Sequence, residues 1–594
     1  MRTLSARYRT VKCGELRLGE AGRAVQLAGW VQNWRDHGGL LFIDLRDRTG
    51  ITQIVFDPNV DKAMFAEAGK LRCEYVITVT GTVRPRLEGN ANLKHATGEI
   101  EVLVKQFELL SASANPPFEP NNFAKVGEDT RLKYRYIDLR RPQMQRAIEV
   151  RHKAAMAARN FLNTLGFLEV ETPILTKSTP EGARDYLVPA RLHPGKFYAL
   201  PQSPQMFKQL LMVAGVDRYY QICRCFRDED SRADRQPEFT QIDIEMSFIE
   251  KEDIFAVTEG LIAAIFKECL DVDLPVPFTR LQYRDAMARY GCDKPDTRYG
   301  MELVDITELM KASTFKVFQS AVEAGSIVKG LCVKGGAEIT RKPIDNYTAF
   351  VADFGAKGLA WMKLQEGKLQ SSIAKFFTED QLKALAAAFG AAEGDLILMV
   401  ADAPKVVHSS LDALRRRLAR DRNLVPEGKL NFLWVDEFPL FQWNAGEQRY
   451  DSEHHPFTAM APEDIPLLDT DPLKVRSQSY DLVLNGYELG SGSIRIHRSD
   501  LQEKVFRLLK LSEEDITTRF GFFVEALKYG TPPHGGIAPG LDRIVMLLLG
   551  TDNIRDVIAF PKTQKAACLM TNAPSTVDHK QLRDLSIEST AKEE

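Results

Sequence analysis

A loop crowded with charge, between two short apolar segments, is the part of this chain best suited to bind a phosphorylated ligand. The first segment ends at Phe226, and the second, residues 238–248, alternates strictly, as a half-buried antiparallel strand would. Its polar face carries Phe239, Gln241, Asp243 and Glu245. Arg227 begins the loop, and arginine engages phosphate in a planar fork. The pattern favours a nucleotide site, although a solvated surface hairpin would show the same mixture of charges.

Two carboxylates further along the chain have the spacing of a magnesium site. Asn485-Gly486 favours a two-residue hairpin turn, which would place Val483 opposite Glu488. Asp481 shares the face of Val483, so Asp481 and Glu488 would project together and offer the oxygen ligands that Mg²⁺ prefers. Solvated carboxylates on a surface hairpin are the alternative interpretation.

Two arginines near this hairpin could meet an anionic ligand. Simple alternation sends Arg495 to the opposite face, and a bulge in the stretch 490–492 would return it. Arg543 follows a glycine-rich strand at the start of an apolar helix, where a charge needs a partner. A triphosphate tail would supply that partner, as would a neighbouring carboxylate.

Further polar candidates gather in three short segments. Ser203, Gln205 and Lys208 stand together at the expected start of a helix, where unpaired backbone N–H groups also collect. A turn-rich loop, 178–185, carries Glu181 and could close over a site. The pair His454-His455 precedes a strand and has no third metal ligand nearby in the sequence.

The first 114 residues read as a β-domain. Strands are expected at 25–34, 40–46, 51–56, 75–83 and 99–109, with a helical piece at 62–71. This order predicts an OB-fold barrel, which frequently reads single-stranded nucleic acid, although a purely structural role fits too. Phe42 and Gln53 are candidates to contact unpaired bases. Candidates to hold phosphates are Arg35, Arg46, Arg84 and Arg86.

The fold class expected is α+β with several domains. After the barrel (1–114) come a hinge (115–145), a first catalytic part (146–294), an inserted α+β domain (295–426), a second catalytic part (427–565) and a C-terminal extension (566–594). The basic stretch 131–141 could touch RNA, but we favour a docked interdomain segment.

Bulk properties limit the classes of partner. The 594 residues carry a net charge of only −3, so an RNA partner would have to meet local basic patches. The eight cysteines are scattered without a CxxC pair, which argues against structural zinc. No signal-peptide pattern and no long apolar run is present, so we expect a cytoplasmic protein with no membrane partner.

These segments together resemble class II aminoacyl-tRNA synthetases. Phe226-Arg227-Asp228-Glu229 with 236–241 resembles motif 2, the helix and strand of 146–175 resemble motif 1, and 535–549 resembles motif 3. The order, the barrel and the insertion are similar to those of the bacterial-type aspartyl-tRNA synthetases. The resemblance implies a homodimer with a six-stranded antiparallel catalytic sheet. It implies ATP and L-aspartate as substrates, Mg²⁺ as the metal, and tRNA(Asp), not DNA, as the nucleic-acid partner.

The same resemblance implies roles for individual residues. Catalytic roles fall on Arg227, Glu229 and Arg543. Contacts with ATP are implied for Arg227, Asp228, Glu229, Gln236, Phe239, Glu488, Gly540, Leu541, Asp542 and Arg543. Contacts with aspartate are implied for Glu181, Ser203, Gln205, Met206, Phe207, Lys208, Arg227, Asp243, His454 or His455, and Arg495. Asp481 and Glu488 match the Mg²⁺ ligands.

The tRNA specificity implied is relaxed. Strictly aspartate-specific members of the family tend to have leucine where His37 stands and a longer residue where Gly89 stands. We therefore expect charging of both tRNA(Asp) and tRNA(Asn), with Arg35, His37, Phe42, Gln53 and Gly89 at the RNA. The alternatives are an asparaginyl- or lysyl-tRNA synthetase and a non-catalytic synthetase-like RNA-binding protein.

Overall fold

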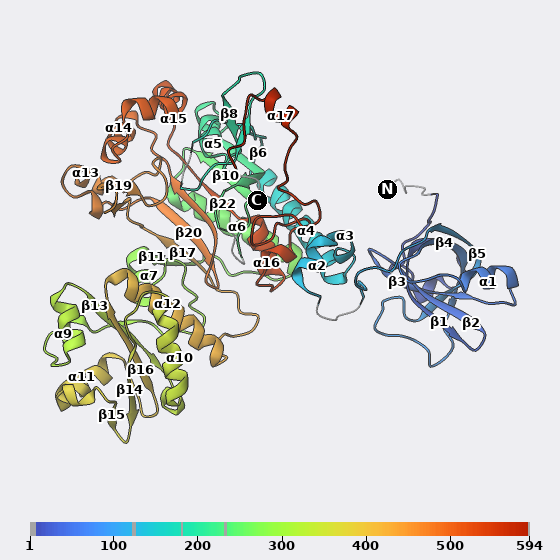
Figure 1. Cartoon of the computed structure of the whole chain (residues 1–594), viewed down its shortest axis with the longest axis horizontal. Helices are drawn as coiled ribbons and strands as arrows, with labels where there is room; N and C mark the ends of the chain where they lie inside the picture. Colours follow the sequence, from blue (N-terminus) through green and yellow to red (C-terminus); the bar gives the residue numbers. More distant parts are fainter. Residues whose placement is uncertain (1–6, 122–125, 180–181, 231–233, 592–594) are drawn as a thin grey trace. The chain divides into compact units, whose positions relative to one another are not determined.

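The computed structural model describes residues 7–121, 126–179, 182–230 and 234–591. The chain forms two compact units. The first comprises Met1–Val150, Ser231–Gln236 and Thr551–Thr576, and the second comprises Arg151–Asp230, Pro237–Gly550 and Val577–Glu594. Figure 1 shows the elements of each unit, which we describe in turn.

The first unit contains the predicted barrel. Its five strands close in the order β1-β2-β3-β5-β4. Their bounds are β1 (Ala24–His37), β2 (Leu40–Asp47), β3 (Gly50–Phe56), β4 (Val76–Pro85) and β5 (Ile100–Ser111), with α1 (Lys62–Ala68) between β3 and β4. Asp61 caps α1, since its carboxylate accepts from the backbone N–H of Ala63 and Met64. The OB-fold prediction is confirmed, because alternation places one apolar face of every strand in a single core.

One buried ion pair in the barrel corrects the sequence analysis. Arg46 was a candidate to hold a phosphate, but its side chain is buried in an ion pair. Its Nη2 donates to both carboxylate oxygens of Glu74 at 2.9 Å. Arg140 adds a second ion pair to Glu74, at 2.7 Å. A bidentate pair removed from water holds the end of β2 against the segment that precedes β4.

Removing this pair should destabilise the barrel. Glu74→Ala leaves the Arg46 guanidinium buried without its carboxylate, and we expect a loss of about 3–5 kcal/mol in the free energy of unfolding. Thermal melting of the whole chain measures the change. Glu67→Ala is the control, because Glu67 pairs with Lys70 on the exposed face of the domain, where an ion pair contributes about 0–1 kcal/mol. Equal melting shifts for the two variants would refute the prediction.

The segment after the barrel is docked, as the sequence favoured. It forms α2 (Glu128–Lys133), α3 (Arg135–Asp138) and the start of α4 (Pro142–Thr164). Arg135 is buried and donates to the backbone carbonyls of Arg555, Ile558 and Ala559, while its Nη1 meets Asp138 at 2.7 Å. These bonds satisfy carbonyls of the segment 551–576, so the basic residues here serve packing instead of RNA.

The second unit is built on an eight-stranded sheet in the order β11-β17-β20-β21-β22-β10-β9-β6. The bounds are β6 (Leu168–Glu169), β9 (Arg218–Phe226), β10 (Glu238–Ser247), β11 (Thr279–Gln282), β17 (Phe432–Asp436), β20 (Ser479–Leu484), β21 (Tyr487–Ile494) and β22 (His534–Pro539). The six central strands are antiparallel, as predicted. Of the two edge strands, β6 lies within the strand expected in 146–175, whereas β11 was not predicted, and both pair in parallel.

Helices flank this sheet (Figure 1). They are α4, α5 (Gln205–Val213), α6 (Lys251–Leu270), α7 (Tyr283–Tyr290), α14 (Ser499–Leu508), α15 (Glu513–Ala526) and α16 (Leu541–Leu548). Four short strands form two further pairs: β7 (Leu187–Pro189) pairs with β8 (Phe197–Ala199), and β18 (Phe441–Asn444) pairs with β19 (Arg449–Ser452). Near the C-terminus lies α17 (His579–Asp584).

The inserted segment has its own five-stranded sheet, in the order β12-β13-β16-β14-β15. The strands are β12 (Val304–Asp305), β13 (Ile327–Val333), β14 (Ala360–Gln365), β15 (Lys368–Gln370) and β16 (Leu396–Asp402). The helices are α8 (Thr307–Met310), α9 (Lys316–Glu323), α10 (Arg341–Ala352), α11 (Glu379–Ala388) and α12 (Pro404–Asp421). Two separate apolar clusters form its core. The expected α+β module is thus present between β11 and β17.

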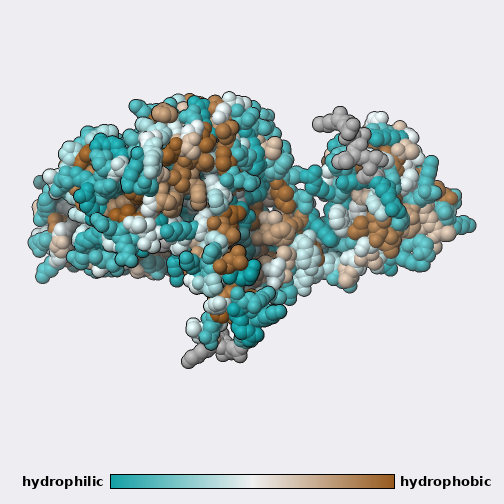
Figure 2. Space-filling model, turned by 90° about the horizontal axis from the view of Figure 1, so that it is seen from above, coloured by the Kyte–Doolittle hydropathy of each residue, from teal (hydrophilic) through white to brown (hydrophobic). Residues whose placement is uncertain are grey.

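The surface in view is mainly hydrophilic, with separate hydrophobic patches (Figure 2). Across the described residues, no helix has the length and the apolar character needed to cross a lipid bilayer. Exposed apolar side chains of the second unit concentrate between residues 168 and 197, where Leu168, Leu187 and Leu192 are 56%, 57% and 75% exposed.

Candidate active site

The strand β10 carries polar groups on a face that the sequence analysis expected to be solvated. The structure corrects this: Asp243 and Glu245 are both 0% exposed. The reason is the position of β10, which pairs with β9 on one side and β22 on the other in the middle of the sheet. Two carboxylates buried this fully need compensating charge.

Two cations supply that charge from different elements. Lys208, on α5, places Nζ 2.8 Å from Asp243 Oδ1 and 3.3 Å from Glu245 Oε2. Arg495, just after β21, donates from Nε to Glu245 Oε1 at 3.0 Å. Both cations are only 2% exposed. Glu245 therefore bridges Lys208 and Arg495, and the four side chains form one buried pocket of alternating charge, which we call the charge pocket.

A bulge brings Arg495 into this pocket. Leu482 pairs with Gly490 and Val483 with Glu488, so Leu489 is an extra residue in β21. The expected bulge is present, one residue before the predicted stretch 490–492. Because it shifts the alternation, Ser493 and Arg495 share the face of Glu488. Arg495 Nη1 donates to Ser493 Oγ at 2.7 Å, which fixes the guanidinium.

The two histidines lie in different surroundings. His455 Nε2 is 2.7 Å from Arg495 Nη1. Burial and the Arg495 charge lower the pKa of His455 well below its usual range, so this imidazole is neutral at pH 7. His454 lies 3.8 Å from Asp481, and although burial opposes the charged form, this carboxylate raises the pKa of His454. His455 thus belongs to the charge pocket and His454 to the carboxylate pair.

The carboxylates Asp481 and Glu488 lie close enough to influence each other, as the hairpin predicted. Burial and the neighbouring Glu488 raise the pKa of Asp481. The pKa of Glu488 is lowered despite burial, because Lys294 and Arg543 stand near it. The pKa values of the two carboxyl groups are therefore shifted in opposite directions, upward for Asp481 and downward for Glu488. Among the described residues, no cluster of three or more metal-ligating side chains occurs.

A third group of residues surrounds the end of β10. The Arg227 guanidinium lies 5.1 Å from the centre of the Phe239 ring, a cation–π contact. Gln241, two residues on, bridges to Gly540 at the start of α16. Arg543 in α16 donates from Nη1 to the backbone carbonyl of Glu488. Neighbouring strands thus connect the arginine–aromatic pair to the carboxylate pair across the sheet.

Polar atoms without partners mark these groups as a ligand site. Buried atoms that find no hydrogen-bond partner within the described residues include Gln205 Nε2, Arg227 Nε, both carboxylate oxygens of Asp243, His454 Nδ1 and Asp481 Oδ1. Asp243 Oδ1 is near Lys208 Nζ, but neither oxygen accepts a bond of good geometry. Buried polar groups are normally satisfied, so this concentration indicates a site that completes its bonds with a ligand.

Three of the residues predicted to contact ATP have side chains that bond or pack within the protein. Asp542 is 3% exposed, and its carboxylate is committed to the Thr240 N–H, at 2.6 Å, and to Arg151. This carboxylate fastens α16 on β10, and the contact of Asp542 with ATP stays a prediction. Leu541 is 2% exposed, so its side chain packs inward. Gln236 exchanges two hydrogen bonds with the backbone of Lys562 in the first unit.

The remaining predicted site residues lie on loops or beside α5. Asp228 forms an exposed ion pair with Arg184, and Glu229 is exposed in the bend that follows. Ser203, Met206 and Phe207 line a small cavity of about 50 Å³ together with Gln202. Glu181 lies outside the described residues.

Comparison with known proteins decides the family. The family model for tRNA synthetases class II (D, K and N) matches residues 127–564. The family model for the OB-fold nucleic acid binding domain matches residues 25–110. The chain belongs to the class II tRNA synthetases. It is 56% identical over 580 residues to the aspartate–tRNA(Asp/Asn) ligase of Protochlamydia amoebophila, covering 98% of this chain and 97% of that protein. The enzyme of the same name from Anoxybacillus flavithermus is 57% identical over 580 residues, with 98% of each chain covered.

Solved structures show the same fold. The asparaginyl-tRNA synthetase of Pyrococcus horikoshii, complexed with asparaginyl-adenylate, matches with a TM-score of 0.59 and 21% identity, covering 93% of this chain and 98% of that one. A putative aspartyl-tRNA synthetase from Leishmania major Friedlin also gives 0.59, at 20% identity, covering 94% of this chain and 95% of that one. The α+β class II synthetase fold is confirmed.

The outer face of the synthetase's barrel carries the predicted RNA residues. Arg35 and Phe42 are register partners on β1 and β2. Arg35 Nη2 donates to Gln53 Oε1 at 3.3 Å, while Gln53 Nε2 donates to Glu101 at 2.8 Å. Both ends of the Gln53 amide are therefore occupied inside the protein. Arg84 likewise pairs with Glu101, at 2.7 Å.

His37 and Gly89 lie in two exposed loops of the barrel. His37 ends β1 beside the turn to β2, and Gly89 follows β4 with φ +81° and open space where a Cβ would stand. A side chain at position 89 would meet no steric obstacle but would be strained by the left-handed backbone.

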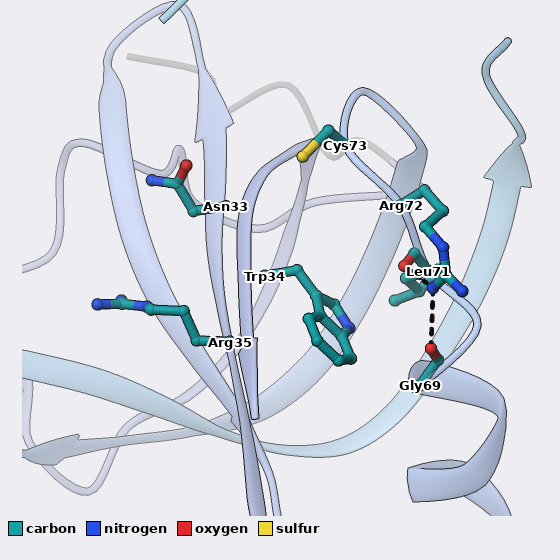
Figure 3. A pocket seen from close by; sticks show the side chains of 7 residues that line it. All are labelled: Asn33, Trp34, Arg35, Gly69, Leu71, Arg72 and Cys73. Carbon is teal, nitrogen blue, oxygen red and sulfur yellow. Dashed lines mark hydrogen bonds between the residues drawn. The ribbon is translucent and has the colours of Figure 1, made fainter. Parts of the chain in front are cut away.

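Sequence reasoning missed a groove of about 550 Å³ on the other side of β1. Trp34 points into it, while Asn33 and Arg35 project the other way (Figure 3). Alternation along β1 explains the split, because Trp34 pairs with the inward-facing Ile43. Arg72 Nη1 donates to the carbonyls of Gly69 and Leu71 at the rim.

Proposed function

We propose that this chain is an aspartate–tRNA ligase that charges tRNA(Asp) and also tRNA(Asn). In the first step an aspartate α-carboxylate oxygen attacks the α-phosphorus of ATP, and pyrophosphate leaves. In the second step a hydroxyl of the 3′-terminal adenosine attacks the acyl carbon, and AMP leaves. The observation that carries the proposal is the charge pocket of Lys208, Asp243, Glu245 and Arg495, buried within a class II tRNA synthetase.

The pocket suits a small molecule with a cation and two anions. Asp243, whose oxygens have bonding capacity left within the described chain, would accept the ammonium group of the amino acid. Lys208 and Arg495 would face its side-chain carboxylate, and Arg227 its α-carboxylate. A neutral amide would leave part of the cationic pair without an acceptor. Sites built this way can reject the wrong analogue by about 10⁴-fold.

The nucleotide would lie along the carboxyl end of β9 and the start of β10. Phe239 offers a ring for adenine and Arg227 a guanidinium for the α-phosphate, in the contact already described. Arg543 would hold the terminal phosphate. Positioning and charge neutralisation, not a protein nucleophile, then lower the barrier.

Asp481 and Glu488 fit a Mg²⁺ ion brought by ATP. Asp481 has a buried oxygen without a partner among the described residues, and Mg²⁺ is usually held by one or two carboxylates plus substrate phosphates. When bound, the ion neutralises charge on the polyphosphate. The two carboxylates would orient it, and His454 lies 3.8 Å from the same Asp481 oxygen, beyond hydrogen-bond distance.

A second copy of this chain is the proposed partner of the segment 168–197. Leu168, Ile174 and Leu175 are each more than half exposed, as are Leu187 and Leu192. Apolar side chains gathered in this way favour burial in an interface. Sedimentation of the purified protein would test the homodimer, and a monomer at micromolar concentration would count against it.

The test of the function is amino-acid-dependent ATP–pyrophosphate exchange, followed by charging of purified tRNAs. We expect exchange with aspartate and none with asparagine or lysine, and aspartyl ester on both tRNA(Asp) and tRNA(Asn). Exchange with asparagine or lysine instead would assign the chain to another synthetase of the group. No exchange with any of them would favour a non-catalytic RNA-binding protein.

His37 is proposed to relax the choice of tRNA. We expect His37→Leu to reduce charging of tRNA(Asn) by about tenfold, which corresponds to about 1.4 kcal/mol, while charging of tRNA(Asp) stays within threefold. Initial rates with each tRNA at limiting concentration measure the ratio. His579→Leu replaces another exposed histidine and should change neither rate. An unchanged ratio in His37→Leu would remove this residue from tRNA selection.

A further inference from the structure

Lys294 is a cation beside the carboxylate pair for which the sequence analysis gave no role. Its Nζ lies 3.5 Å from Glu488 Oε2 and 3.8 Å from Asp293 Oδ1. Close ammonium–carboxylate bonds measure about 2.7–2.9 Å, so both contacts are loose. The side chain is 37% exposed, and an ammonium group has three donors. Lys294 therefore has bonding capacity beyond these two loose contacts.

Lys294 lies near Arg543, because both side chains contact Glu488. Arg543 approaches the same residue, Glu488, from its backbone carbonyl, while Lys294 approaches the carboxylate. Both cations thus contact Glu488, so a polyanion bound by Arg543 at this residue would also come close to Lys294.

The inserted domain holds the segment that carries Lys294. Arg415, on α12 and 0% exposed, donates to the backbone carbonyls of Asp296, Gly300 and Met301. Its guanidinium also lies 4.5 Å from the centre of the Tyr299 ring. A buried arginine that satisfies three carbonyls fixes the path of this short segment firmly.

The same segment touches the hairpin of the carboxylate pair. A Cβ on Gly486, in the turn between β20 and β21, would stand 3.2 Å from Asp296 Cβ. Asn431 Nδ2 also donates to Thr297 Oγ1. Residues 294–301 are therefore held by the inserted domain on one side and by the hairpin on the other.

We propose that Lys294 binds the pyrophosphate half of ATP as a second cation beside Arg543, and that Arg415 of the inserted domain holds it in position. This inference rests on the proposed function and deepens it. It gives the inserted domain a part in nucleotide binding. Neutralisation of the carboxylate pair alone, without contact to phosphate, is the competing role for Lys294.

Comparison of ATP with AMP separates these roles, because AMP lacks the β- and γ-phosphates. In Lys294→Gln we expect calorimetry in Mg²⁺ buffer to show ATP binding weakened roughly 10- to 100-fold, the loss of one charged contact. AMP binding should stay within twofold. In exchange assays the KM for ATP and for pyrophosphate should rise while that for aspartate holds. Lys294→Arg should recover most of the ATP affinity.

Lys311→Gln is the matched control, since Lys311 pairs with Glu308 on the surface of the inserted domain. Unchanged ATP affinity in Lys294→Gln would overturn the proposal, and equal weakening of ATP and AMP would show a merely structural role. If the unaltered chain binds ATP but shows no aspartate-dependent exchange, the proposed function fails instead, and the ATP–AMP comparison still stands.

Arg415→Lys tests the part of the inserted domain. It keeps the charge but loses the planar fork, so ATP binding should weaken at temperatures where circular dichroism shows the variant folded. Combined with Lys294→Gln, it should weaken ATP binding no further than Lys294→Gln alone, since both act through one contact. Additive losses, or no loss in Arg415→Lys, would remove the inserted domain from the proposal.

Discussion

Replacing Arg227 by alanine should lower the rate of aspartate-dependent ATP–pyrophosphate exchange by about 10³-fold or more. In the proposed function Arg227 meets the α-phosphate and the substrate carboxylate where charge develops, and donors of this kind contribute factors of about 10²–10⁵. Its Nε is buried and has no hydrogen-bond partner in the described chain, so the loss falls on the ligand and not on the fold. Single-turnover formation of aspartyl-adenylate measures the effect on the first step alone.

The control for Arg227 stands three residues earlier, on β9. Arg224 is exposed and pairs with Glu238, and Arg224→Ala should leave the exchange rate within about twofold. Arg227→Lys should fall between alanine and the unaltered chain, because lysine keeps the charge without the planar fork. Exchange by Arg227→Ala at more than a tenth of the original rate would show that this arginine does not stabilise the transition state.

Local periodicity explains why much of the fold could be predicted. Alternation is a property of each strand by itself, so the barrel strands and β10 were found close to their true bounds. The Asn485-Gly486 turn fixed the pairing of Val483 with Glu488 for the same reason. The strand β11 has only four residues, which is too short a pattern to be recognised, and its pairing with β17 depends on contacts distant in the chain.

Partners across the fold could not be predicted. Glu245 was placed on the right face of β10, but its role as the bridge between Lys208 and Arg495 depends on three elements meeting. The sequence around Arg46 does not show whether this arginine binds a phosphate or pairs with Glu74. Lys294 gains its position from Arg415, more than a hundred residues later. The pairing of buried charges that are far apart in the chain thus cannot be predicted from a single sequence.

The charge pocket leads to the second large effect. Lys208→Met should reduce kcat/KM for aspartate in the exchange reaction by about 10⁴-fold, because the substrate carboxylate loses one of two facing cations. The change also leaves Asp243 and Glu245 with Arg495 as their remaining cation within the charge pocket. Breaking such a buried network costs about 3–5 kcal/mol of stability, so melting must accompany the kinetics.

Binding of ATP separates a local effect in Lys208→Met from general unfolding. Calorimetry should show aspartate binding abolished and ATP affinity within about threefold, since Lys208 belongs to the amino-acid end of the site. Lys251→Met is the control. Lys251, at the start of α6, pairs with Asp436 at 2.6 Å and is not part of the charge pocket. Both affinities should therefore be unchanged in this variant. Aspartate affinity retained by Lys208→Met would contradict the assignment of the pocket, because two buried cations would then not be needed to hold a small diacid.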